Sequence, residues 1–295
     1  MNTAISLLPW GRVGVGAAVA LLVSACGAEA SPSASVSSSQ LQAEVVPTEL
    51  VVGPQQRLPI GILDHNTPVS DATVHVRAFI LQSGNTAVFK GESDAPFKGA
   101  GLEGAGVYVA HLSFDTAASW GIEISASRPN GEHVVLRQAL PQVAASPTVP
   151  GIGQLALASH NLSVKDVPDL SYIDSGKPPD DMHQLSIADA LARHQPALVV
   201  FASPALCVSR ICGPEVHAVQ SLEPAYRDRL AFIHIEPYQL KPVPSREHLN
   251  PVVTEWRLQT EPWIFLIDAK GVIQARFEGP TASDEIKAAI DQLLH

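Results

Sequence analysis

The sequence predicts two folded domains of different class, an antiparallel β-sandwich followed by an α/β domain. Short strand-like runs separated by turns fill the region from about residue 47 to 142, with almost no helical periodicity. From about residue 183, apolar runs alternate with helical patterns instead, which is typical of an α/β domain. A chain of 295 residues is also long enough for two domains behind a leader.

The first 25 residues have the proportions of a secretory signal peptide. They carry one charged side chain, Arg12, ahead of the apolar run Val13–Val23. That run is shorter than the roughly 20 residues of a comfortable membrane span. It ends in Leu22-Val23-Ser24-Ala25-Cys26, which resembles the lipobox of bacterial lipoproteins. The resemblance implies cleavage before Cys26, lipid attachment to Cys26, and a protein anchored to the cell membrane that faces outside the cytoplasm.

A tract rich in serine, alanine and proline follows, at Gly27–Gln40. Such a composition cannot bury enough apolar surface to fold, so residues 26–46 are predicted to be a flexible tether. The net charge of -10 and the lack of a lysine or arginine cluster argue against nucleic acid as a partner. No cofactor and no resident metal ion are expected.

The predicted β-sandwich covers residues 47–142. Its strand-like runs are Arg57–Leu63, Ala72–Leu81, Val107–Phe114, Trp120–Ser125 and Glu132–Leu140. In the second run Val74, Val76 and Ala78 fall on one face, as expected of a half-buried strand.

The order Gly106-Val107-Tyr108, Phe114 and Trp120–Ile124 resembles a pattern of bacterial immunoglobulin-like domains, with Ser119 where that pattern usually has glycine. The resemblance implies an immunoglobulin-like sandwich that serves as a spacer or as a partner-binding module.

Residues 143–182 are assigned to a linker, because proline- and glycine-containing stretches mark both of its ends, at Ser146–Gly151 and Ser175–Asp181. The α/β domain then covers residues 183–295. Its predicted helices are Ser186–His194, Pro214–Asp228 and Ser283–Leu294, and its predicted strands are Ala197–Phe201, Leu230–Ile235, Trp263–Asp268 and Val272–Phe277. Ser186 and Ser283 are the expected helix N-caps.

Three segments of this domain, in this order, resemble the thioredoxin fold. They are Val199–Pro204, then Cys207-x4-Cys212-Gly213-Pro214, then Thr260–Asp268 with Gly271. The last is similar to a segment of membrane-tethered thioredoxin-like proteins of bacterial envelopes. Pro224 also matches the proline that kinks the long helix of thioredoxins. The departure is the cysteine spacing, since the family normally has Cys-x-x-Cys.

The two cysteines left after Cys26 are expected to form a disulfide, because a close pair in an oxidising compartment usually does. So small a loop gains less stability from a bridge than a long one does, which favours a functional role. Helical positions five apart have Cα atoms roughly 8–9 Å from each other. A disulfide can span a Cα–Cα distance of at most about 7 Å, so the two cysteines cannot both be helical if they pair. Pro214 suits the first helical position. This places Cys212 at or just before the helix start and Cys207 in the preceding loop.

The roles of the two thiols stay open. Cys212 at a helix N-terminus would be stabilised as a thiolate, and an alignment of Cys212–Glu215 with Cys-Gly-Pro-Cys makes it the attacking thiol. Aligning Cys207 as the first cysteine after the strand reverses the roles. The resemblance implies that Pro262 is a cis-proline facing the cysteines, with Glu261 offering backbone groups to a bound peptide.

The strand Ala197–Phe201 lacks the buried acid of many thioredoxins. Glu215 and Glu236 are the possible substitutes, and both are expected to be solvated surface carboxylates.

The function predicted first is thiol–disulfide exchange with extracytoplasmic protein thiols or disulfides, through Cys207 and Cys212. One alternative is a copper-handling chaperone with the thioredoxin fold, in which His217, His234 or His248 would supply a third ligand. The other is a non-catalytic binding or assembly lipoprotein, which the unusual cysteine spacing favours.

Overall fold

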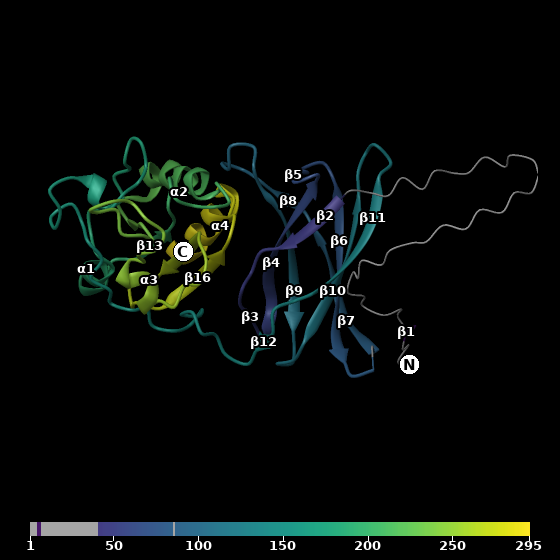
Figure 1. Cartoon of the computed structure of the whole chain (residues 1–295). Helices are drawn as coiled ribbons and strands as arrows, with labels where there is room; N and C mark the ends of the chain where they lie inside the picture. The colour runs from purple at the N-terminus through teal and green to yellow at the C-terminus, as the bar shows by residue number, and fades with distance from the viewer. Residues whose placement is uncertain (1–4, 7–40, 85) are drawn as a thin grey trace, which may run out of the picture.

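The computed structural model describes residues 5–6, 41–84 and 86–295, which form two regions lying side by side (Figure 1). Residues 41–144 make up an all-β region of mainly antiparallel sheets, and residues 145–295 make up a mixed α/β region with one four-stranded sheet. Cys26, the predicted signal peptide and most of the predicted tether lie outside the described residues. Among the described residues, no helix has both the length and the apolar character needed to cross a membrane.

Two sheets face each other in the β region, as in a β-sandwich. The first has the order β1-β7-β6-β10-β11, with bounds Ile5–Ser6, Thr86–Ala95, Thr73–Gln82, Trp120–Ser127 and His133–Ala139. The second has the order β2-β4-β9-β8, with bounds Leu41–Val45, Gly53–Asp64, Val107–Phe114 and Phe97–Lys98, and β5 (Thr67–Pro68) pairs with β4. The short strands β3 (Leu50–Val51) and β12 (Val143–Ala144) form a separate parallel pair.

The core of the β region lies between these sheets and confirms the alternating pattern. Val74, Val76 and Ala78 of β6 are all buried, whereas the residues between them are partly exposed. Phe114 and Trp120 meet edge to face with ring centroids 4.9 Å apart, a favoured aromatic geometry.

Two strands of this region differ from the sequence prediction. Strand β2 lies within the predicted tether and pairs with β4, so the β region includes residues upstream of residue 47. Strand β7 was not predicted, because its apolar residues are few and most of its side chains face solvent. It pairs with β6 along almost its whole length, which indicates that tertiary pairing rather than local propensity places it.

The α/β region is built on the sheet order β14-β13-β15-β16. The bounds of these strands are Ala231–Ile235, Ala197–Phe201, Trp263–Ile267 and Ile273–Glu278. Strand β13 runs parallel to β14 and antiparallel to β15. All four strands were predicted, with small differences at their ends.

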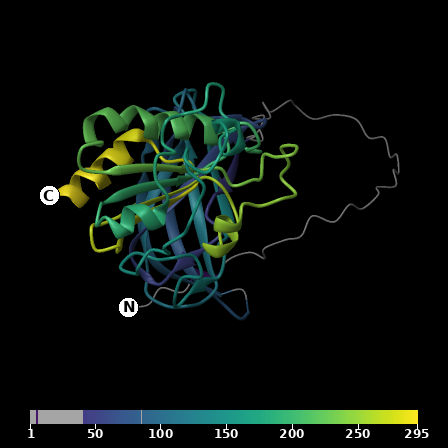
Figure 2. The same ribbon diagram turned by 90° about the vertical axis from the view of Figure 1, so that its left-hand side faces the viewer.

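Helices cover both faces of this sheet (Figures 1 and 2). Helices α2 (Cys212–Tyr226) and α4 (Ser283–Leu294) pack with Leu198 and Val200 on one face. Helices α1 (Ile187–Ala192) and α3 (Pro251–Glu255) pack with Val199 on the other. Every residue of β13 is therefore buried, which explains its unbroken apolar sequence.

The helix ends follow the prediction in part. Ser186 caps α1 and forms a capping box with Asp189, as expected. Pro224 lies inside α2, but α2 begins at Cys212, two residues before Pro214. The assignment of Ser283 as an N-cap was wrong: Ser283 is the first residue of α4, and the N-cap is Ala282, whose N–H donates to the carboxylate of Glu285 at 3.3 Å. The short helix α3 was not predicted.

The predicted linker packs along both outer edges of the four-stranded sheet. Near its start, Gly153 donates its N–H to the carbonyl of Ile273 at 2.8 Å, beside β16. Near its end, the carbonyl of Met182 accepts a hydrogen bond of 2.8 Å from the N–H of His234 in β14. A one-turn 3-10 helix, η1 (Leu170–Tyr172), lies between these points. Residues 145–182 thus belong to the α/β region, whereas β12 belongs to the β region.

Arg57 of β4 joins the two regions. Its guanidinium makes a two-pronged ion pair with Glu285 of α4, at 2.9 and 3.1 Å, and donates to the carbonyl of Pro280 at 2.6 Å. A second pair, Glu49 with Arg276, has a separation of 2.8 Å. These partly buried contacts hold the β region against the end of the α/β sheet.

Candidate functional site

Cys207 and Cys212 form a disulfide at the beginning of helix α2. Their Cα atoms are 6.0 Å apart, so the inference that both cannot be helical is confirmed. Cys212 is the first residue of α2 and is 0% exposed. Cys207 lies in the loop between β13 and α2, is partly exposed, and has its sulfur 3.3 Å from the hydroxyl of Ser209. Of the two cysteines, Cys207 is therefore the one open to solvent.

The loop before β15 lies beside the cysteine loop. Because Phe201 at the end of β13 pairs with Trp263 at the start of β15, the segments that flank these two residues are brought together. The peptide bond between Glu261 and Pro262 is cis, as predicted.

Glu261 brings a carboxyl group to the disulfide. One of its carboxylate oxygens lies within 4.8 Å of both sulfur atoms. The carboxylate of Glu261 accepts a hydrogen bond of 2.7 Å from the N–H of Ser203 and is also hydrogen-bonded to the hydroxyl of Tyr238. Burial raises the pKa of Glu261 to about 7, aided by the nearby charge of Glu236 and opposed by these hydrogen bonds. The sequence assigned only backbone groups of Glu261 to the site.

Glu215 and Glu236 are buried, so the expectation that they are solvated was wrong. Glu215 is on the face of α2 that packs inward, and Glu236 follows β14 beneath the segment that contains Ser175. Burial raises the pKa of both carboxyls, that of Glu215 well above its usual value. Each has one carboxylate oxygen without a hydrogen-bond partner.

A mainly apolar cleft of about 300 Å³ adjoins the cysteine loop. Residues of both regions line it: Glu44, Val46, Gly61, Pro68, Ala105, Gly106 and Val107 from the β region, and Ser209, Ile211, Thr260, Glu261, Pro262, Glu278, Gly279 and Pro280 from the α/β region. The β region thus forms one wall of the space beside the candidate site.

The three histidines considered as copper ligands do not gather at the cysteines. His217 is exposed and pairs with Glu103 at 2.8 Å, and His248 is also exposed. His234 is buried and pairs with Asp180. Within the part of the chain that the structure describes, the possible metal-ligand group that includes both cysteines adds Glu261 and no histidine.

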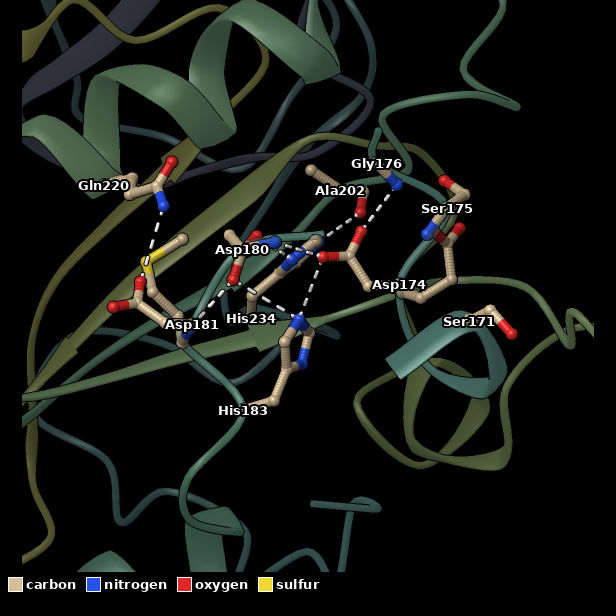
Figure 3. A network of polar contacts seen from close by, with 12 residues as sticks. Ser171, Asp174, Ser175, Gly176, Asp180, Asp181, His183, Ala202, Gln220 and His234 are labelled. Atoms are coloured by element: carbon tan, nitrogen blue, oxygen red, sulfur yellow. Dashed lines mark hydrogen bonds and ion pairs between the residues drawn. The ribbon is translucent and has the colours of Figure 1, made fainter. Parts of the chain in front are cut away.

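A second polar group lies inside the α/β region and consists of Asp174, Asp180, His183 and His234; we call it the Asp–His cluster (Figure 3). The first three come from the segment along the edge of β14, and His234 comes from β14 itself. One oxygen or nitrogen atom from each of the four lies within 4.8 Å of the others. Figure 3 shows the four side chains pointing toward one another.

The hydrogen bonds of the Asp–His cluster are well defined at His234 and weak at His183. The two ring nitrogens of His234 face Asp180 at 2.7 Å and the carbonyl of Ala202 at 2.8 Å. The Nε2 atom of His183 lies 3.2 and 3.3 Å from oxygens of Asp174 and Asp180, and its Nδ1 atom has no partner. Backbone N–H groups donate to both carboxylates, including that of Asp180 to Asp174 at 2.7 Å.

The charges in the Asp–His cluster stabilise one another. Burial by itself lowers the pKa of His234, but the hydrogen bond and charge of Asp180, with the charge of Asp174, outweigh burial and raise it to about 9. Burial raises the pKa of both carboxyls, but the histidines, with backbone N–H groups at Asp174, more than offset this, so both pKa values fall below the usual 3.8.

The sequence did not reveal this cluster, because Asp174 and Asp180 belong to the predicted linker and His183 is the first residue of the predicted α/β domain. The only signal was three aspartates and a histidine within ten residues, Asp174 to His183, in a stretch that also contains two prolines and a glycine.

Comparisons with protein families and with curated proteins find no match. Among solved structures, the chain is similar in part to an engineered protein determined by the Northeast Structural Genomics Consortium, at 15% sequence identity. That match covers 36% of this chain and 20% of the engineered protein, with a TM-score of 0.25. So slight a likeness identifies neither a fold family nor a function.

Proposed function

We propose that this protein is a thioredoxin-like, membrane-anchored protein that exchanges disulfides with extracytoplasmic proteins through Cys207 and Cys212. The observation that carries the proposal is the position of the disulfide. It joins the first residue of a helix to a partly exposed loop, beside Pro262 and a carboxyl group that titrates near neutral pH. A purely structural bridge needs none of these neighbours.

Cys207 is the attacking thiol in this proposal, and Cys212 is the resolving one. Cys207 is partly exposed and can be reached by a substrate, whereas Cys212 is buried. The Cys207 thiolate attacks a substrate disulfide and forms a mixed disulfide, releasing one substrate thiolate. The Cys212 thiolate then attacks the Cys207 sulfur and releases the second. Two electrons pass to the substrate, and the Cys207–Cys212 disulfide is formed; the reverse sequence oxidises a substrate dithiol.

Glu261 supplies the proton transfer that the strand before the cysteines lacks. Its carboxylate takes a proton from a cysteine thiol when the pair acts as a reductant, and its carboxylic acid gives one back to a leaving thiolate in the reverse direction. A pKa of about 7 leaves both forms populated near neutral pH. The carboxylate oxygen of Glu261 lies up to 4.8 Å from the sulfur atoms. Proton transfer over this distance needs either a small movement of the side chain or one intervening water molecule.

The two regions have separate tasks in this proposal. The β region, an immunoglobulin-like sandwich, forms one wall of the cleft beside Cys207 and accommodates a segment of the substrate protein. Lipid on Cys26 attaches the chain to the membrane, which keeps the site among extracytoplasmic proteins.

The test compares Cys207→Ser and Cys212→Ser, both in a Cys26→Ser background so that no third thiol reacts. Reduced protein is mixed with an oxidised model protein substrate, and adducts are separated by non-reducing electrophoresis. We expect Cys212→Ser to accumulate a mixed disulfide, because its resolving thiol is missing, and Cys207→Ser to form none. Ser221→Ala, on an exposed position of α2, is the matched control and retains full exchange.

The reduction potential of the pair separates the proposal from a non-catalytic role. A potential below about -300 mV is typical of structural disulfides. Such a value, together with no adduct in either serine variant, would reject thiol–disulfide exchange and favour the binding or assembly role.

A further inference from the structure

The Asp–His cluster holds four metal-binding side chains in the interior of the protein. The exposed fractions of its side chains are 0% for Asp174 and His234, 1% for His183 and 5% for Asp180. We propose that these four residues bind one divalent transition-metal ion, with Zn²⁺ the best suited, in a closed structural site. The proposal is independent of the redox chemistry at Cys207 and Cys212.

The distances between the donor atoms suit a tetrahedral ion. Zinc bonds of about 2.0–2.1 Å place neighbouring ligand atoms about 3.3–3.4 Å apart. The Nε2 atom of His183 lies 3.2 and 3.3 Å from its two carboxylate neighbours, at the long end of hydrogen-bonding distances. The Nδ1 atom of His234 lies 2.7 Å from Oδ2 of Asp180, whereas the contact of 3.3 Å from His183 is to Oδ1. The contact with Oδ2 would lengthen by roughly 0.6 Å if this oxygen and Nδ1 bound the same ion.

The hydrogen bonds around the cluster orient the donors toward its centre. The Nε2–H group of His234 donates to the carbonyl of Ala202, which leaves Nδ1 free to bind a metal ion. Backbone N–H groups of Gly176 and Met182 donate to the carboxylates of Asp174 and Asp180. Such outer partners fix the tautomer of a metal-binding histidine and the direction of a metal-binding carboxylate.

Electric charge also favours a metal ion. Without one, the two buried carboxylates have only the two histidine rings as side-chain partners of possible positive charge. No lysine or arginine of the described residues pairs with either carboxylate. A divalent cation bound by two carboxylates and two neutral imidazoles makes the group neutral.

The donor set identifies the class of metal. Imidazole nitrogens suit zinc and its neighbours in the periodic table, whereas Mg²⁺ and Ca²⁺ prefer oxygen ligands alone. Burial of all four side chains leaves no open position for water or substrate, as in structural zinc sites. The ion would fasten the segment of Asp174, Asp180 and His183 to β14. Ser175, in the same segment, contacts Ser203 at the start of the cysteine loop.

The experiment measures metal binding by the full chain with its disulfide kept oxidised, so that thiolates do not compete. The protein is unfolded in denaturant with a chelator, then refolded with limiting Zn²⁺ or Co²⁺, because a closed site fills during folding. We expect one ion per chain and a visible Co²⁺ spectrum typical of tetrahedral nitrogen and oxygen ligands, without a thiolate charge-transfer band.

Asp180→Asn tests the site while preserving its hydrogen bonds. Its amide oxygen still accepts from the N–H of Met182, and its NH₂ group donates to a neutral His234, so the fold is retained. We expect this change to weaken binding by more than about 100-fold, since even outer partners of metal ligands contribute 10- to 100-fold. The exposed neighbour Asp181 provides the matched control, Asp181→Asn, which binds as the unchanged protein does.

Three results would overturn the proposal. They are substoichiometric metal in the refolded protein, equal affinity of the unchanged protein and Asp180→Asn, or equal weakening by Asp181→Asn. If Asp180→Asn does not refold, His183→Gln decides instead, because His183 makes only long contacts that the fold can lose.

Discussion

The carboxyl group of Glu261 lies against the disulfide and exchanges its proton near neutral pH. Ordinary cysteine thiols have a pKa of about 8.5, so most of such a pair is unreactive at neutral pH unless a base removes the proton. At pH values above about 7, Glu261 is a carboxylate and can do so. At pH values below about 7, the protonated form of Glu261 gives its proton to a leaving thiolate instead. The two directions of exchange therefore have opposite pH dependence.

Glu261→Gln tests this role. Glutamine keeps the size of the side chain and accepts the hydrogen bond from Ser203, but it cannot take a proton. For reduction of a substrate disulfide, we expect the rate at pH 7.5 to fall by about tenfold to a hundredfold. In the unchanged protein the rate should rise with pH around 7, the pKa of Glu261. In the variant the rate should rise around the pKa of the cysteine thiol instead. Stopped-flow kinetics between pH 5.5 and 9.5 measure both.

An electrostatic role alone gives the opposite result. A carboxylate beside a thiolate repels it and raises the thiol pKa, so its removal would then speed the reaction at pH 7.5. A faster Glu261→Gln variant contradicts the proton-transfer role. Glu247→Gln, at an exposed position, is the control and keeps the original profile.

Single residues were predictable where one local rule decides them. The spacing of Cys207 and Cys212 limits their conformations, so their placement at the helix start was inferred correctly. The burial of Glu215 and Glu236 was not, because an acid in a helix or after a strand has no local mark that separates an inward from an outward position. The proximity of Glu261 to the sulfurs depends on the pairing of β13 with β15, which sequence spacing does not encode.

The start of helix α1 shows how one element depends on its cap. The side-chain oxygen of Ser186 accepts from the N–H of Asp189 at 3.0 Å, and the carboxylate of Asp189 accepts from the N–H of Ser186 at 3.3 Å. A helix of six residues is too short to be stable by itself, so the cap and the packing of Ile187 and Ala190 keep it formed.

Ser186→Ala removes the side-chain half of this capping box. Ser186 is buried, so water cannot take over the hydrogen bond, and we expect a loss of about 1 kcal/mol in the free energy of unfolding. Urea denaturation followed by circular dichroism measures the loss. Ser186→Thr keeps the hydroxyl and should lose much less. Equal midpoints for Ser186→Ala and the unchanged protein would show that the cap contributes nothing.

Elements were predicted best where burial is complete on both faces. Strands β13 and β15 are continuous apolar runs, and the sequence identifies them without ambiguity. Strand β7 has polar and charged residues over most of its length, since only a few of its side chains face the core. The segment of residues 145–182 is irregular and held by hydrogen bonds to sheet edges, so no periodicity marks it.

The β region and the α/β region are joined by contacts between side chains of one region and groups of the other. The guanidinium of Arg57 reaches across to Glu285 and to the carbonyls of Glu278 and Pro280, and it lies 5.7 Å from the ring centre of Phe277. Both charged side chains of the pair are about nine-tenths buried. Breaking such a pair on one side leaves the other charge without compensation.

Arg57→Ala is therefore expected to loosen the α/β region from the β region. We expect a loss of about 3 kcal/mol, and calorimetry should show two separate unfolding transitions in place of one. Arg77→Ala is the matched control. It also removes an arginine from an ion pair on a strand of the β region, with Glu123, but its partners all lie within that region. A single transition in both variants would mean that Arg57 does not couple the regions.

The segment that borders β14 and β16 has a consequence for aggregation. A sheet whose outer strands present free N–H and C=O groups can add strands from another molecule. Here the hydrogen bonds to Met182 at one edge and to Gly153 and Gln154 at the other occupy part of those groups. A fragment cut at residue 183 would lose this protection and expose the edges of β14 and β16, of which β14 is largely apolar. The smallest soluble piece of the α/β region accordingly begins before Gly151, well upstream of the boundary that composition suggests.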